Sequence, residues 1–222
     1  MNTLTAKLIA KELHQYRWMM AGATAAGLAA LPMAASSKTG FHIAFIVWVT
    51  AVIALAVMLA IYGVGNERKE RARLFVLSLP LSPRDYVRIK VLGLFACFFG
   101  PWLALSLGAA TLILVAPDVP DGLLPYTVLM CVYLLLNFAL VLCAALHIAS
   151  EGAMGGVIIV TNMSVSLFLS ALGHVPDIGT HMQAAEPVWN TAFWLILALE
   201  LGATALALTL PLLVAARRRD FL

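Results

Sequence analysis

Charged side chains are scarce in this chain of 222 residues, because Asp, Glu, Lys and Arg together make up only 11% of it. A soluble domain usually contains about 25% of these residues and about 45–50% apolar ones. Here hydrophobic residues make up 63%, and the mean hydropathy is +0.97. The composition therefore excludes an ordinary soluble protein and indicates an integral membrane protein. The net charge of +3 does not indicate nucleic-acid binding, because the basic residues lie where membrane topology would place them.

Motifs for cofactors and metals are also lacking. The sequence contains no G-x-x-x-x-G-K-[ST] phosphate loop and no G-x-G-x-x-G turn after a strand, so it predicts no nucleotide site. The three cysteines stand singly in apolar runs and are interpreted as small buried hydrophobes. His174, Asp177 and His181 could hold a metal outside the membrane, but isolated polar loop residues explain them better. We therefore expect the chain itself to bind no metal and no cofactor.

Long apolar runs make up most of the chain. At about 1.5 Å per residue, each of six runs is long enough to cross about 30 Å of hydrocarbon. The runs cover residues 18–37, 41–65, 91–116, 125–149, 154–173 and 191–216. We expect an all-α fold in which residues 1–222 form a single domain of six transmembrane helices.

The first residues of the chain have a different pattern. Apolar side chains recur at helical spacing within residues 3–16, and Lys7, Lys11 and His14 fall on the opposite face. This pattern predicts an amphipathic helix that lies in the membrane surface, with its lysines toward anionic lipid headgroups. The alternative is that residues 3–16 simply begin the first span on the cytoplasmic side.

The distribution of basic residues predicts the orientation of the chain. Cytoplasmic loops of membrane proteins carry an excess of Lys and Arg. If both termini are cytoplasmic, all but Lys38 of the 14 Lys and Arg residues lie on the cytoplasmic side. The opposite topology would reverse this count. We therefore expect both termini to lie in the cytoplasm.

Residues 66–90 form a basic segment between the second and third apolar runs, with seven basic and three acidic side chains. Glu67 and Arg71 lie four residues apart, and Glu70 and Arg73 lie three apart, which favours a short helix. The apolar side of this helix would carry Leu74, Phe75 and Leu77. A solvated charged hairpin is the alternative, but the aromatic and leucine content favours a surface that docks onto a partner.

Proline and serine divide this basic segment into two parts. Pro80 ends the first helix. Ser82 can cap a second helix, with Pro83 in its first turn and Asp85 reaching back to the cap. The second helix would run through Lys90 into the third span. We predict a helix, a tight break and a second helix, held rigidly at the membrane face.

Glu200 is an ionisable residue deep inside a predicted span. Burying a carboxylate in a bilayer costs several kcal/mol by most measures, so such a residue is a functional candidate by default. Alternatively Glu200 is structural, and is either protonated or bonded to a neighbouring helix through Asn137 or Asn162. Both interpretations stay open at this stage.

The first span is dominated by small residues at four-residue spacing. Such spacing lets helices approach closely in lipid, where hydrophobic association has no driving force. The small-residue face contains Gly22, Ala26 and Ala30. It indicates a contact either within the bundle or between two copies of the chain, and the sequence leaves both possibilities open.

The basic segment also resembles a known family. Glu67, the run Leu77-Ser78-Leu79-Pro80-Leu81-Ser82-Pro83-Arg84 and then Lys90 are similar to the "LLSLPxS…K" segment of the membrane subunit of type-two ATP-binding-cassette exporters. The closing Arg217-Arg218-Arg219-Asp220-Phe221 is similar to the usual ending in that family. One departure is the glycine that usually lies between the glutamate and the leucine-rich run, since this chain has Ala72 and Arg73 in that region.

The resemblance implies six spans, a cytoplasmic coupling helix between the second and third, and a role in transport. Two permease subunits, identical or different, would pair in the bacterial cytoplasmic membrane and form the substrate pathway. Each would dock a separate ATPase subunit that binds ATP and Mg²⁺, so the chain itself would not be an enzyme. Export is the implied direction of transport. The residues implied in coupling to the ATPase are Glu67, Glu70, Arg71, Leu74, Phe75, Leu77, Pro80, Ser82 and Arg84.

Two other classes of protein stay open. One is a membrane scaffold or assembly factor without a transport role, which would copurify with no ATPase. The other is a membrane-embedded enzyme, which would need paired catalytic residues at one depth in the membrane. Only Glu200 offers a candidate for such a pair.

Overall fold

The computed structural model describes residues 3–65 and 82–217, and throughout these ranges the chain is helical between short connections. Two side-by-side segments begin it, α1 (Thr3–Ala34) and α2 (Lys38–Ala60), and α2 continues into a π-helical turn, η1 (Ile61–Gly65). The remaining helices are α5 (Pro83–Val115), α6 (Leu123–His147), α7 (Glu151–His174), α8 (Pro176–Gly179) and α9 (Thr191–Arg217). The described part of the chain therefore has the predicted all-α fold.

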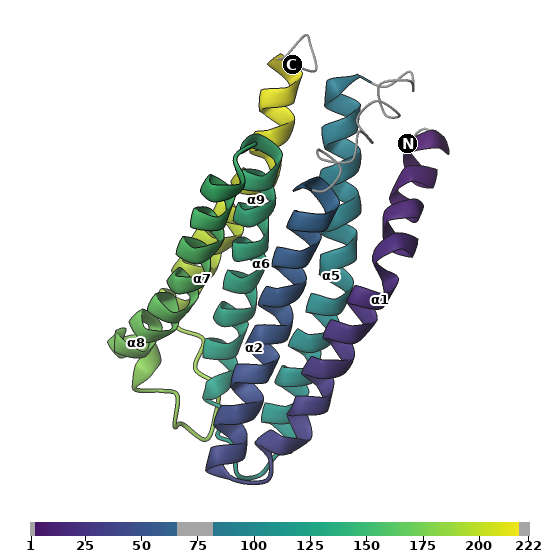
Figure 1. Ribbon diagram of the computed structural model, residues 1–222. Coiled ribbons are helices and arrows are strands. Elements are labelled where there is room, and N and C mark those ends of the chain that lie inside the picture. Colours follow the sequence, from purple (N-terminus) through teal and green to yellow (C-terminus); the bar gives the residue numbers. More distant parts are fainter. Residues whose placement is uncertain (1–2, 66–81, 218–222) are drawn as a thin grey trace.

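The long helices run up and down in an elongated bundle (Figure 1). The start of α1 and the end of α9 lie at one end of this bundle, together with the end of η1 and the start of α5. The turns from α1 to α2 and from α5 to α6 lie at the opposite end. The residues on either side of 66–81 therefore lie at the same end as the described chain ends. We call this the terminal end of the bundle.

Five helices in the described ranges are long and apolar enough to cross a membrane. They correspond to the second to sixth predicted runs, with the same bounds for the sixth run and bounds that differ by a few residues for the others. The five are Lys38–Gly65, Arg84–Val115, Leu123–His147, Glu151–His174 and Thr191–Ala216. The chain is thus a multi-pass membrane protein by length and composition.

The first predicted run differs from the other five. Residues 3–16 and most of 18–37 belong to one unbroken helix, α1, so the boundary expected near residue 17 is absent. The reason is local, because Gln15-Tyr16-Arg17-Trp18 contains no helix breaker. At about 1.5 Å per residue, 32 residues extend about 48 Å, which is longer than a hydrocarbon core of about 30 Å. That α1 crosses the membrane stays a prediction.

The core of the bundle is centred on α6, most of whose side chains are buried. Phe98 of α5 and Phe138 of α6 are fully buried and stack with their ring centroids 4.1 Å apart. About half of the side chains of α7 and α9 are exposed, and large apolar residues are prominent among them. In a membrane protein such faces meet lipid or other subunits.

Candidate functional site

The start of α5 is held by the cap that the sequence predicts. Ser82 has an extended backbone, and its Oγ accepts a hydrogen bond from the backbone N–H of Asp85 at 3.1 Å. The Ser82 hydroxyl donates in turn to Oδ2 of Asp85 at 2.6 Å. Pro83 lies in the first turn of the helix. The predicted second helix is therefore confirmed, and it continues through Lys90 into the third span.

The other proposed coupling residues, from Glu67 to Pro80, lie outside the described residues. Arg84 is described, and its side chain is exposed beside the Ser82 cap. The stiff first turn of α5 thus directly follows the segment in which the ATPase contact is predicted.

A buried ion pair joins α1 to α5 near the terminal end of the bundle. Nζ of Lys90 lies 2.7 Å from Oε1 of Glu12, and both side chains are buried, at 3% and 5% exposure. Gly93 allows the two helices to approach here, because a Cβ on it would lie 3.0 Å from Cγ of Glu12. The N-terminal part of α1 is therefore packed on α5 along this face rather than separate from the bundle.

Sequence reasoning missed this ion pair, although one signal was present. Glu12 is the only acidic residue before Glu67. It lies one helical turn after Leu8 and one before Tyr16, so it falls on the apolar face of the amphipathic pattern. A single acid on such a face needs a buried cation, and Lys90 supplies it.

Glu200 lies on α9 and is 4% exposed. Within the described ranges, neither of its carboxyl oxygens has a hydrogen-bond partner. The predicted bond to Asn137 or Asn162 is therefore not formed. Asn137 instead donates its side-chain N–H to the carbonyl oxygen of Thr161 at 2.8 Å, which ties α6 to α7. Oδ1 of Asn162 is buried without a hydrogen-bond partner in the described structure.

Helix α9, which carries Glu200, packs against both α6 and α5. Cys131 of α6 is buried, and Oγ of Ser106 of α5 has no hydrogen-bond partner in the described structure. Oγ of Ser106 is buried, like the Glu200 oxygens. Buried polar atoms without a strong partner are rare in folded proteins and are expensive in a membrane. This region between α5, α6 and α9 is therefore the candidate functional site inside the bundle.

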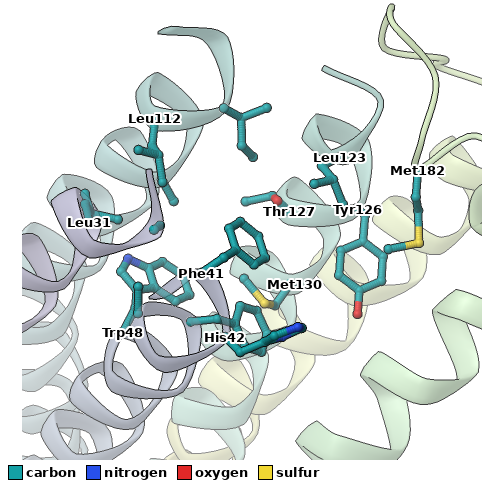
Figure 2. Close-up of a pocket in the computed structure, with 15 residues that line it drawn as sticks. Leu31, Phe41, His42, Trp48, Leu112, Leu123, Tyr126, Thr127, Met130 and Met182 are labelled. Carbon is teal, nitrogen blue, oxygen red and sulfur yellow. The ribbon is translucent and has the colours of Figure 1, made fainter. Parts of the chain in front are cut away.

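A cavity of about 230 Å³ lies near the end of the bundle opposite the terminal end (Figure 2). Residues of α2, including Phe41, His42 and Trp48, line it opposite Tyr126 and other residues of α6. Its walls are mostly apolar or aromatic. Two of the polar groups in the walls already have hydrogen-bond partners. The Trp48 indole N–H donates to the α5 backbone, and the Tyr126 hydroxyl donates to the α7 backbone. The cavity suits an apolar group, and His42 is the one basic side chain in its wall.

The two histidines considered as metal ligands, His174 at the end of α7 and His181, have local partners. Nδ1 of His174 lies 2.7 Å from the Ser170 carbonyl oxygen, and Nδ1 of His181 lies 3.1 Å from that of Asp177. Nowhere in the described ranges do three His, Cys, Asp or Glu side chains gather in a way that could hold a metal ion.

Comparison with known proteins identifies the family. The family model described as "ABC-2 family transporter protein" matches residues 7–210. The chain belongs to the ABC-2 transporter family. Searches of curated proteins and of solved structures gave no significant match.

Membership of the ABC-2 family identifies the chain as a membrane component of a transporter and not as a catalytic subunit. It also implies an ATPase subunit as partner. The match covers the candidate sites described above, from Glu12 to Glu200. It therefore favours transport over the scaffold and enzyme alternatives.

The small residues of α1 in this ABC-2 protein point in different directions. Gly22 and Ala26 are exposed, and nothing lies within 4 Å of the position of a Cβ on Gly22. Ala30 is only 3% exposed and clusters with buried Ala34 and Ala44. Ala30 thus serves packing within the chain, because α1 turns this part of its surface toward α2. Gly22 and Ala26 remain predicted contacts to a second subunit.

Proposed function

We propose that this chain is the permease subunit of an ATP-binding-cassette exporter in the bacterial cytoplasmic membrane. It pairs with a second permease subunit, identical or different, and the two form the substrate pathway. A separate ATPase subunit binds ATP and Mg²⁺ and docks on the segment around residues 66–82. The ABC-2 family match and the resemblance of the Leu77–Lys90 region to exporters support this function.

The observation that carries the proposal is the position of the basic segment. The ends of η1 and α5 that flank residues 66–81 lie at the same end of the bundle as the start of α1 and the end of α9 (Figure 1). Among the described residues, the parts of α1 and α5 at that end carry five basic side chains, which favours a cytoplasmic location. The five are Lys7, Lys11, Arg84, Arg88 and Lys90. An ATPase in the cytoplasm would meet this end, and the Ser82 cap would give its contact a stiff continuation into α5.

The first test concerns the orientation. Lys38 and Arg84 are both exposed and lie at opposite ends of the bundle. After the three native cysteines are replaced by alanine, Lys38→Cys should react with an impermeant maleimide on intact cells. Arg84→Cys should react only after the membrane is opened. The reverse pattern would contradict a cytoplasmic coupling segment.

The second test concerns the partner. The tagged chain, purified from its native membranes in mild detergent, should carry an ATPase subunit that mass spectrometry identifies. ATP hydrolysis should be found in the complex and be lost when that subunit is removed. A functional preparation that contains no ATPase would instead support the scaffold alternative.

A further inference from the structure

The ion pair between Glu12 and Lys90 connects α5, which begins directly after residues 66–81, to α1. Lys90 lies about two helical turns after the Ser82 cap, within the same unbroken helix α5. Glu12 lies on α1, which passes along both α2 and α5 (Figure 1). The pair therefore connects the helix that emerges from residues 66–81 to the first helix of the chain.

The surrounding contacts show that this ion pair is buried and tightly packed, unlike a surface ion pair. Both side chains are more than nine-tenths buried, and the Nζ to Oε1 distance is 2.7 Å. Gly93 lies one turn after Lys90 and brings the backbone of α5 within reach of Glu12 and Ile9. Tyr16, one turn after Glu12, is buried in the main core together with Cys97 of α5. Along this seam α1 has little freedom to slide past α5.

The chemistry of the pair argues for a role beyond packing. Replacing a buried ion pair with apolar residues of similar volume is often neutral or stabilising, whereas removal of one partner is strongly unfavourable. Two apolar residues could therefore hold these helices together equally well. A charge pair additionally fixes one relative register of the two helices, which is the best-attested use of buried polar pairs.

We propose that Glu12 and Lys90 are positioning residues that make α1 follow α5 when the ATPase moves the start of α5. This inference rests on the proposed function. Movement of the start of α5, at the Ser82 cap, would pass through the ion pair to α1. The exposed Gly22 and Ala26 lie further along α1, so the same movement would reach the face where a second subunit is predicted. The ion pair thereby links the ATPase contact to the arrangement of the two permeases.

The experiment measures the distance between α1 and α5 in the purified complex with its ATPase. Spin labels are attached at Ala10→Cys and Arg88→Cys, both exposed positions, after the native cysteines are replaced by alanine. Distances are recorded without nucleotide and in the vanadate-trapped state. In the parent protein we expect one narrow distribution that is the same in both states.

Glu12→Gln keeps the shape of the side chain and removes its charge. In this variant we expect a clearly broader distance distribution without nucleotide, and a distance that shifts on vanadate trapping. ATP hydrolysis by the complex should fall roughly 2- to 30-fold, which is the range of couplings through packed side chains. The reversed pair, Glu12→Lys with Lys90→Glu, should restore the narrow distribution and much of the hydrolysis. Lys11→Gln removes an exposed charge beside Glu12 and should change neither measurement.

A second variant, Gly93→Leu, tests the inference even if Glu12→Gln does not fold. Gly93→Leu retains both charges and pushes α1 away from α5, so it should broaden the distribution in the same way. Narrow, unchanged distributions in both variants, or a parent distance that changes on trapping, would overturn the inference. The measurement without nucleotide does not depend on the ATPase. If no ATPase copurifies with the parent protein, the proposed function fails separately.

Discussion

Replacing Glu200 with leucine should make the protein more stable and less active. Both carboxyl oxygens are buried without a hydrogen-bond partner in the described structure. An unpaired buried polar group costs about 1–3 kcal/mol, and an acid at the centre of a membrane helix costs about 2.5–3.5 kcal/mol on insertion scales. Leucine fills a similar volume, so little cavity is created. We expect Glu200→Leu to raise the free energy of unfolding by about 2 kcal/mol.

Thr204 provides the matched control on the same helix. It is 5% exposed, and its hydroxyl donates a hydrogen bond to the carbonyl oxygen of Glu200 at 2.8 Å. Thr204→Val has nearly the same shape but loses this bond, so it should lower the free energy of unfolding by about 1 kcal/mol. A partnered and an unpartnered polar group, one helical turn apart, should therefore respond in opposite directions.

The assay has a stability arm and an activity arm. Unfolding by denaturant in mixed micelles is followed by tryptophan fluorescence. Free energies of unfolding are compared only between variants whose slope of free energy against denaturant concentration equals that of the parent protein. ATP hydrolysis is measured in the complex with its ATPase. We expect Glu200→Leu to lower hydrolysis, because an unpartnered polar group that is retained despite its cost is expected to serve function. Loss of stability in Glu200→Leu would refute this reasoning and make the carboxyl group structural. Unchanged hydrolysis would show that the carboxyl group has no role in activity.

Three further predictions concern the cavity, the subunit face and the ATPase contact. Trp48→Phe should lower the free energy of unfolding by about 1 kcal/mol, because the hydrogen bond from the Trp48 indole to the α5 backbone is lost. Trp18 is 76% exposed, so Trp18→Phe should have no effect in the same assay. Gly22→Cys should crosslink two permeases in native membranes and the buried Ala30→Cys should not, and equal yields would refute the predicted face. Phe75→Ala should leave the chain inserted but weaken ATPase binding by about 2 kcal/mol or more, as for an aromatic anchor. Copurification of the ATPase at the parent level would show that Phe75 is not at the contact.

The features that sequence predicted well are those with local causes. Long apolar runs predicted five of the spanning helices, because length and hydropathy are properties of one segment. The start of α5 was predicted to the residue, because Ser82, Pro83 and Asp85 form the cap from neighbours in sequence. Both kinds of signal can be read without knowing what packs against them.

The features that sequence missed depend on partners far away along the chain. Lys90 lies 78 residues from Glu12, and nothing near either residue specifies the other. The small residues of α1 indicated close packing, but only the direction of each side chain separates buried Ala30 from exposed Gly22. The interpretation of Glu200 was likewise limited, because Asn137 donates instead to Thr161 of α7, a partner 24 residues away.

Helix α1 therefore has two contrasting parts. Toward the opposite end of the bundle it packs through small residues, since a Cβ on Gly27 would lie 2.6 Å from Cδ2 of Leu105. Near the terminal end it is held by the ion pair of Glu12 and Lys90. Small residues let the two helix backbones approach closely, whereas a buried charge pair additionally fixes one register of the two helices. The proposed ATPase contact is at the terminal end of the bundle, so α1 must keep its register with α5 there. The ion pair lies at this same end of α1.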